Sequence, residues 1–214
     1  MLSRFGIPLA NMAFVTDVDG IEKAAKDIGY PVVLKLVASR VTHKTELGAV
    51  KVNLKSVHEL EGAAREMEAA FKNNMPKGVV EGFLVQEMVC GSVETIIGAV
   101  NDPQYGPVVM FGIGGVFVEL YKDVVFRMAP IGQEEALDMI RGIKGYPLLN
   151  GFRGKPTIDL ESLAQAIVSV SNLALAGREW IQSIDVNPFI PLERGGKVVD
   201  AVIVTGKKEH RTSP

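Results

Sequence analysis

Cysteine is nearly absent from this sequence: Cys90 is the only one among 214 residues. The chain therefore cannot form an internal disulfide, which fits a reducing cytoplasmic setting. The sequence also lacks an apolar run of the ~18–20 residues needed to cross a bilayer. Its first residues lack the long apolar stretch of a secretory signal. We therefore expect a cytoplasmic protein with no membrane association.

An excess of charge of either sign is missing too. Lysine and arginine number 23 and the acids 25, for a net charge of −2. The overall charge thus gives no reason to expect a nucleic acid as partner. Three common signatures are absent: Gly-x-x-x-x-Gly-Lys-Ser/Thr, His-Glu-x-x-His and Cys-x-x-Cys. With 47% apolar residues, the chain can build one large or two small cores.

The apolar residues follow helix and strand periods in turn. The patterns predict helices at Val18–Gly29, from Ser56 onward, at Gly132–Ile143 and at Asp159–Ala176. They predict strands at Val32–Val37, Ala49–Leu54, Phe83–Met88, Glu94–Val100, Val108–Phe111 and Val116–Leu120, and a hairpin of Ile184–Pro191 with Lys197–Val204. Paired strands beside helices favour an α+β fold with antiparallel sheets. A glycine step after residue 90 predicts two lobes, residues 1–90 and 91–214.

Two features could bind phosphate. Lys35 lies inside an apolar strand, where a lysine is costly unless its charge meets a partner such as phosphate. An exposed strand face is the simpler explanation, and this segment alone favours it. The glycine run at 112–115 could offer backbone amides to a phosphate. A tight bend under close packing explains the run equally well.

Several acids interrupt apolar strands. Glu87 and Glu94 flank the glycine step, where a hinge could bond an adenine edge and a carboxylate the ribose; two solvated acids would look the same. Asp185 and Asn187 share one strand face because side chains alternate, and Asp200 lies nearly opposite Asn187. Oxygen ligands that converge in this way suit Mg²⁺ when phosphates complete its shell. A hairpin with polar outward residues is an equal alternative.

Histidine offers a single candidate. His43 lies in the polar stretch Ser39–Gly48 between two predicted strands, so we expect it on an exposed loop. A lone loop histidine is usually a solvated bystander. His43 gains a role only if the surrounding residues identify one.

Longer strings across the chain supply that context. Together they resemble the ATP-grasp domain of ADP-forming (NDP-forming) acyl-CoA synthetases, over nearly the whole length. The strings are Tyr30–Lys35, Thr42–Val50, Asn101–Glu119, Lys122–Arg127, Tyr146–Gly154 and Asp185–Pro188. The resemblance implies an ATP-grasp fold that holds ATP or ADP with Mg²⁺ between two lobes. It also implies the reaction acyl-CoA + ADP + phosphate ⇌ acid + CoA + ATP.

The resemblance also implies roles for individual residues. Lys35 matches a lysine that binds phosphate, and Arg127 matches a further nucleotide contact. Glu87 matches the acid of an adenine-binding hinge that includes Val89, and Glu94 matches an acid that binds the ribose. Asn187 and Asp200 match the metal ligands, with Asp185 nearby. His43 matches a transient phosphohistidine that carries phosphate to ADP. Its motif is His-Lys-Thr-Glu here, where the family usually has His-Lys-Ser-Asp.

The family implies a partner as well. CoA binding and a first phosphohistidine belong to a separate α subunit or domain, so we expect an αβ hetero-oligomer. The N-terminus is about a helix shorter than the family pattern. The alternative function is a non-catalytic ATP-grasp module that senses nucleotide and regulates a bound or fused enzyme.

Overall fold

The chain forms two compact units. A computed structural model describes residues 1–38, 49–76, 78–115, 123–154 and 156–206. The small unit is Ala10–Met88, and the large unit combines Met1–Leu9 with Val89–Pro214. The first nine residues thus differ from the expected 1–90 lobe. They pack with the large unit because Ile7, 2% exposed, belongs to its hydrophobic core.

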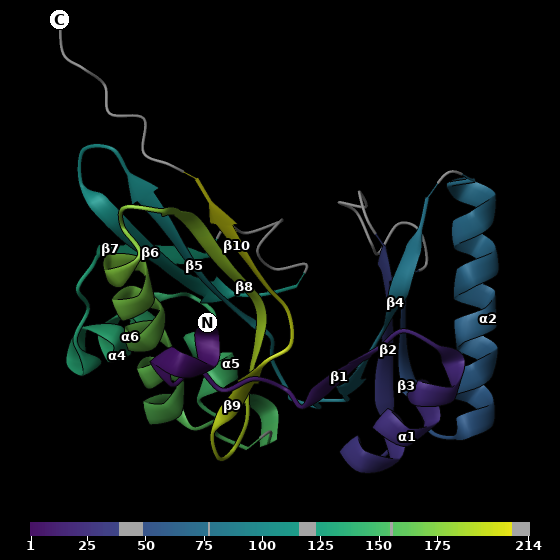
Figure 1. The fold of residues 1–214 in the computed structure, drawn as a ribbon. Coiled ribbons are helices and arrows are strands. Elements are labelled where there is room, and N and C mark those ends of the chain that lie inside the picture. The colour runs from purple at the N-terminus through teal and green to yellow at the C-terminus, as the bar shows by residue number, and fades with distance from the viewer. Residues whose placement is uncertain (39–48, 77, 116–122, 155, 207–214) are drawn as a thin grey trace, which may run out of the picture. The chain divides into compact units, whose positions relative to one another are not determined.

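The small unit is an antiparallel sheet with helices on one face (Figure 1). Its strand order is β1-β4-β2-β3. The elements are β1 (Met12–Val15), α1 (Val18–Ile28), β2 (Val32–Ala38), β3 (Val50–Leu54), α2 (Val57–Asn74) and β4 (Val80–Glu87). Leu60, Met67 and Phe71 line the predicted apolar stripe of α2 and are buried against the sheet.

Two side-chain hydrogen bonds cap the N-terminus of α2. The Ser56 hydroxyl accepts one from the Glu59 backbone amide at 3.2 Å. The Glu59 carboxylate accepts the other from the Lys55 backbone amide at 2.8 Å, one residue before the capping serine. The helix begins where the sequence placed it, because the first turn gains both caps.

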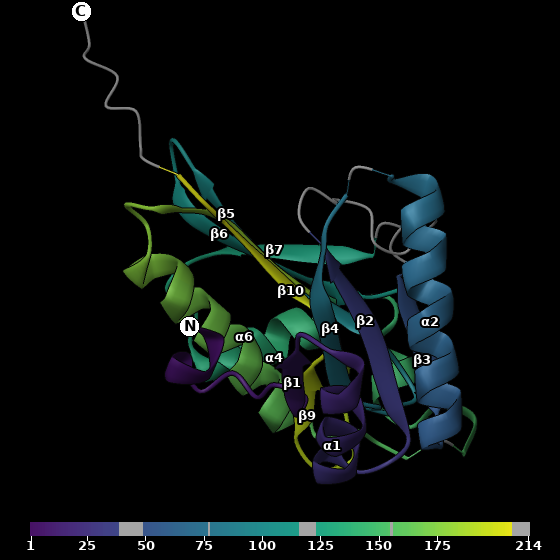
Figure 2. The same cartoon turned by 45° about the vertical axis from the view of Figure 1, so that its right-hand side comes forward.

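The large unit is a second antiparallel sheet, of order β10-β8-β5-β6-β7, with β9 paired to β8. Its strands are β5 (Thr95–Asp102), β6 (Gly106–Ile113), β7 (Val124–Met128), β8 (Ile181–Pro191), β9 (Gly196–Val198) and β10 (Ala201–Thr205). Its helices are η1 (Leu2–Phe5), α4 (Gln133–Gly142), α5 (Tyr146–Leu149), η2 (Phe152–Gly154) and α6 (Leu160–Ala176). The edge strands are β7 and β10, and Figure 2 shows α4 and α6 together on one side of this sheet.

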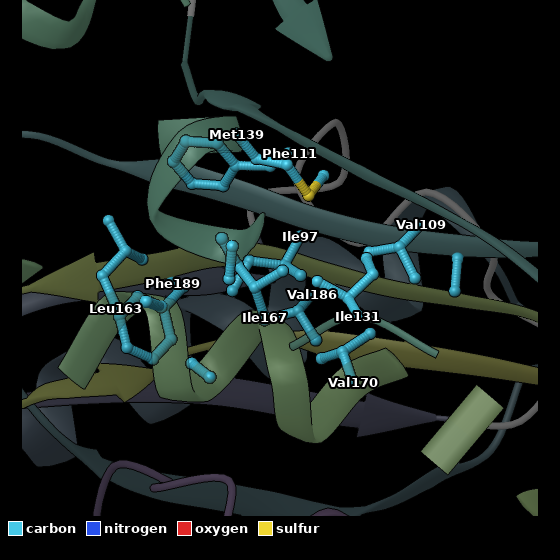
Figure 3. Close-up of a cluster of buried hydrophobic side chains, with 14 of the residues drawn as sticks. Ile97, Val109, Phe111, Ile131, Met139, Leu163, Ile167, Val170, Val186 and Phe189 are labelled. Carbon is cyan, nitrogen blue, oxygen red and sulfur yellow. The ribbon is translucent and has the colours of Figure 1, made fainter. Parts of the chain in front are cut away.

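The core of the large unit lies between α4, α6 and one face of this sheet. Leu163, Ile167 and Val170 of α6 meet Ile97 and Val186 of the strands, and all five are fully buried (Figure 3). Burying a side chain of this size contributes about 1.5–3 kcal/mol. Among the described residues, no helix packs on the opposite face of this sheet.

The α+β class and the antiparallel sheets are confirmed. The predicted strand at 197–204 is split at Val199–Asp200 into β9 and β10, and both pair with β8. The expected strand Val116–Leu120 lies outside the described residues. Within those residues, no helix is long and apolar enough to cross a membrane.

Candidate functional site

The sheet face away from α4 and α6 is the candidate site, and we call it the open face. Pairing between strands sets one row of side chains across it. Asp185 lies opposite Val202 on β10 and opposite Gly98 on β5. Gly98 in turn lies opposite Met110 on β6, which lies opposite Phe126 on β7. The row therefore runs from an acid to an exposed aromatic ring.

Three polar residues meet at one end of the open face: Asp185, Asn187 and Asp200, here called the acidic corner. The backbone amide of Asn187 donates a hydrogen bond to the backbone carbonyl of Asp200 at 3.0 Å, so these two residues lie directly opposite each other. Partial burial raises the pKa of the Asp185 carboxyl, and the Asp200 carboxylate raises it further. Asp185 is exposed as a whole residue, but burial and the Asp200 charge both raise the pKa of its carboxyl.

The acidic corner has the chemistry of a divalent cation site. Two carboxylates that repel each other and a nearby amide oxygen would be stabilised by a cation, and Mg²⁺ prefers such oxygen ligands. Among the described residues, no group of three or more His, Cys, Asp or Glu side chains could hold a metal by itself. Phosphate oxygens would have to complete the shell. Metal binding by Asn187 and Asp200 therefore stays a prediction that the geometry fits.

A hollow of about 350 Å³ lies in the middle of the open face. Gly98, Met110, Phe126 and Asp185 are among its lining residues. A Cβ added to Gly98 would lie 3.3 Å from the Met110 methyl carbon, so a larger residue at this position would take up part of the hollow. The sequence analysis missed this feature. A lone glycine inside an apolar strand was the available signal, because it often marks a close approach.

Lys35 lies on the equivalent helix-free face of the small unit. Leu34 and Leu36 are buried on the helix side of β2, so alternation turns Lys35 to the other side. There it is half-buried and lies opposite Leu84 of β4 and Val50 of β3. The strand is thus apolar toward its helices, and its lysine lies on the face that a ligand could reach.

The two hinge acids belong to different units. Glu87 ends β4 in the small unit, and its carboxylate accepts a hydrogen bond from the Asn11 amide at 3.0 Å. Val89 follows and is buried in the large unit. Glu94 is exposed, and its backbone carbonyl accepts from the Gly114 amide at 2.7 Å. Nucleotide contacts by these residues stay predictions.

Close packing accounts for two glycines of the run at 112–115. A Cβ on Gly112 would lie 2.6 Å from the Asp123 carbonyl oxygen. A Cβ on Gly114 would lie 3.2 Å from the Glu94 carbonyl carbon. The first distance is shorter than real Cβ contacts, and the second is tighter than most, so a larger residue at either position would press on backbone atoms. The structure therefore favours the tight-bend explanation here, and the phosphate cradle stays a prediction.

The structure does not bring Arg127 to the open face. Arg127 lies opposite the buried Val109 and so faces the helices. Its guanidinium lies 3.7 Å from the Glu135 carboxylate of α4 and donates to the Phe126 carbonyl. A nucleotide contact by Arg127 would require it to leave Glu135. His43 lies outside the described residues.

Comparison with known proteins gives a consistent result. The sequence pattern of the ATP-grasp domain matches residues 1–205. The β subunit of acetate–CoA ligase [ADP-forming] I from Pyrococcus furiosus is 42% identical over 204 residues, which are 95% of this chain and 88% of that subunit. Acetate–CoA ligase [ADP-forming] I from Archaeoglobus fulgidus is 43% identical over 97% of this chain, but this chain spans only 30% of that protein's length.

A solved structure is also similar. Acetyl-coenzyme A synthetase 1 of Ca. Korarchaeum cryptofilum, in complex with coenzyme A, Ca-AMPCP and HgCl⁺, superposes with a TM-score of 0.91 at 44% identity, covering 96% of this chain and 89% of that one. Other structures of that enzyme contain a phosphorylated phosphohistidine segment, or Mg-AMPPCP with the phosphohistidine segment pointing towards the nucleotide binding site.

Proposed function

Because this chain belongs to the ATP-grasp domain family, and to the family of ADP-forming acetate–CoA ligase β subunits, we propose that it is the nucleotide-binding β subunit of an ADP-forming acyl-CoA synthetase. The reaction is acyl-CoA + ADP + phosphate ⇌ acid + CoA + ATP. The chain's part is to hold ATP or ADP with Mg²⁺ and to pass the phosphoryl group to or from the nucleotide.

The observation that carries this proposal is the acidic corner beside the hollow of the open face. Asn187 and Asp200 are the proposed metal ligands, and the Asp200 carboxylate already opposes ionisation of Asp185. The adjoining hollow has apolar walls that fit part of an organic ligand. Polar ligands for a metal and apolar walls for a ligand therefore lie on one sheet.

The other proposed contacts follow from charge and position. Lys35 would neutralise phosphate as a point charge from a half-buried strand position. Val89 and Glu87 would bind the adenine at the hinge, and Glu94 the ribose. Asn187 and Asp200 would hold Mg²⁺, which would offset the phosphate charge in the transition state. Arg127 keeps its predicted nucleotide contact only if its ion pair with Glu135 opens.

His43 is the proposed phosphoryl carrier. A neutral imidazole is a competent nucleophile near pH 7 because its ordinary pKa is about 6.5. A phosphorus–nitrogen bond to His43 would form as the bond from phosphorus to its donor on the partner breaks. A terminal oxygen of ADP would then attack the phosphorus, and the phosphorus–nitrogen bond would break. The carrier divides the phosphoryl transfer into two in-line steps, and each step can occur at a site that excludes water.

A CoA-binding α part is the proposed partner. The Pyrococcus relative is a separate β subunit, and the Archaeoglobus relative is more than three times as long as the matched region. The remaining length of such a protein is available for CoA and acyl chemistry. We propose that this chain works with an equivalent α part in an αβ hetero-oligomer.

The metal is the sharpest test. Asp200→Asn removes one proposed ligand charge, so the Mg²⁺ concentration for half-maximal ATP formation should rise at least about tenfold in the complex with the α part. Asp138→Asn is the matched control, because Asp138 is an exposed acid of α4 that lies 3.5 Å from Arg141 of the same helix. An Mg²⁺ titration that is unchanged in Asp200→Asn would move the metal site elsewhere.

A further inference from the structure

The first residues of the chain are anchored in both units. In the large unit, Ile7 is buried in the core and the Pro8 carbonyl accepts a hydrogen bond from the Val198 amide at 2.8 Å. Leu9 forms a parallel bridge with Val198 of β9. Ala10, 2% exposed, then leads into the small unit. We call residues 7–11 the strap.

The strap is held in the small unit by Glu87. The backbone amide of Glu87 donates to the backbone carbonyl of Asn11 at 2.8 Å. The backbone amide of Asn11 donates to the side-chain carboxylate of Glu87 at 3.0 Å. Regular pairing of β1 with β4 begins at the next pair, Met12 with Gln86. The Glu87 side chain thus fastens the strap just before the chain leaves the small unit at Met88.

We propose that Glu87 is a positioning residue, a latch that fastens the strap and thereby restrains the junction between the two units. The chain passes between the units after Leu9 and after Met88. Glu87 joins the small-unit ends of these two passages. This inference rests on the nucleotide binding proposed above, and it gives Glu87 a task besides any contact with the ligand.

The physical reason is conformational entropy. The proposed ligands of one nucleotide come from both units, with Lys35 in the small unit and Asp200 in the large one. A junction restrained at both passages has fewer arrangements to lose when the nucleotide binds. A hydrogen bond to a carboxylate is also stronger than one between neutral groups. Loss of the latch should therefore weaken nucleotide binding without any lost contact to the ligand.

Hydrogen exchange tests the latch itself, in the full chain without nucleotide. Glu87→Ala should speed exchange of the Asn11 amide by on the order of tenfold, because its acceptor is removed. Glu87→Gln keeps a neutral acceptor and should recover most of the protection. Glu81→Ala is the matched control, since Glu81 is an exposed acid of the same strand. Unchanged Asn11 exchange in Glu87→Ala would overturn the proposal.

A covalent replacement separates positioning from direct contact. In a Cys90→Ser background, Asn11→Cys with Glu87→Cys puts two thiols on facing residues of an antiparallel pair, where a disulfide can form. The reduced protein should bind ADP with Mg²⁺ about tenfold more weakly than the background protein. The oxidised protein should regain most of that affinity, because the disulfide fastens the strap without a carboxylate. The part that stays lost is the direct adenine contact proposed for Glu87.

The outcomes discriminate clearly. Equal weakness of the oxidised and reduced forms would overturn the latch, because the Glu87 carboxylate would then act by touching the nucleotide. Wild-type affinity in Glu87→Ala, with faster Asn11 exchange, would also overturn a positioning role. If the wild-type chain binds no nucleotide, the proposed function fails and the coupling with it. The exchange experiment would still show whether Glu87 holds Asn11.

Discussion

The surroundings of Asp185 oppose the charge of its carboxylate. Burial first, and the Asp200 carboxylate second, raise its pKa above the ordinary 3.8. The folded protein thus holds this proton more tightly than the unfolded chain does, and ionisation costs stability as the pH rises above that ordinary value. Without Mg²⁺ and nucleotide, Asp185→Asn should raise Tm at pH 7. The rise should be small, about 1 °C, because water screens an exposed residue.

The pH dependence is the check on that prediction. Near pH 3 the side chain of Asp185 is protonated in both states, so thermal unfolding of Asp185→Asn and wild type should coincide. Asp138→Asn, on the surface of α4, is the control for the effect of the substitution itself. A lower Tm of Asp185→Asn at pH 7 would show that its carboxylate is favourably paired in the folded chain.

Lys35 gives a second prediction at this scale. Lys35→Met keeps the apolar stem and removes the ammonium, so the fold should persist while affinity for ADP falls at least about tenfold. Calorimetric titration measures the affinity. Lys51→Met is the control, because Lys51 is on the neighbouring strand and pairs with Glu66 of α2. Equal losses in both variants would point to general charge rather than to a phosphate site.

Strand alternation predicted part of the candidate site. It placed Asp185 and Asn187 on one face with Asp200 opposite, and the strand pairing brings the three together. It could not place Arg127, because the facing of β7 depends on its register with β6 and not on its own sequence. Phe126 escaped notice for the same reason: it follows Val124 and Val125, and a short apolar run gives no sign of which face each residue takes.

Among the elements, α6 depends on its N-cap. Asp159 accepts from the Ser162 amide at 3.0 Å and from the Gly195 amide at 2.9 Å, so it joins the helix to the turn between β8 and β9. The Gly195 bond is the largest of the causes that lower the pKa of Asp159. Asp159→Ala should cost about 1–2 kcal/mol of unfolding free energy at pH 7, measured by urea unfolding.

The charge of Asp159 predicts how that loss varies with pH. A lowered folded pKa means that the stabilisation is present above pH 3.8 and is lost as the pH falls through the folded pKa. The gap between wild type and Asp159→Ala should therefore narrow in acid. Asp159→Asn keeps a capping oxygen and should recover part of the stability at pH 7, with a flatter acid limb. A gap that widens in acid would contradict this account.

Helices were more predictable than strands for a physical reason. A long helix repeats its buried face several times, as Leu163, Ile167 and Val170 do in α6. The four-residue strand β1 is long enough for only two repeats of the inward–outward pattern, and half of its residues are exposed. Its pairing with β4 comes from the tertiary structure. The sequence therefore predicted α6 closely and did not predict β1.

At the scale of the whole molecule, the proposed partner determines activity. The purified chain alone should bind ADP with Mg²⁺ yet form no acyl-CoA from acid, CoA and ATP. The addition of the CoA-binding α part should restore the reaction. Thiol release from added acyl-CoA in the presence of ADP and phosphate measures it in the other direction. Acyl-CoA formation by the chain alone would contradict a divided enzyme.

His43 is best tested in that complex. With the α part and γ-labelled ATP, the chain should acquire an acid-labile, base-stable label, which is typical of phosphohistidine. His43→Ala should lose the label and the overall reaction but keep nucleotide affinity. His58→Ala is the control, because His58 lies in the first turn of α2. Normal turnover in His43→Ala would make His43 a bystander.

The division into two units was only partly readable from the sequence. The glycine step after Cys90 marked one passage between them. Nothing local showed that Ile7 completes the core of the later unit, because a short apolar segment suits either core equally well. Long-range contacts of this kind become visible only when the partners are known.

Ribosomal synthesis gives the strap a further consequence. Pro8 is made early, but its hydrogen-bond partner Val198 appears 190 residues later. At about 5–20 residues per second, this separation is roughly 10–40 s of translation. The small unit lies between them and can fold during that delay. The large unit closes around an early segment that has waited throughout, so it behaves as a host domain and the small unit as an insert within it.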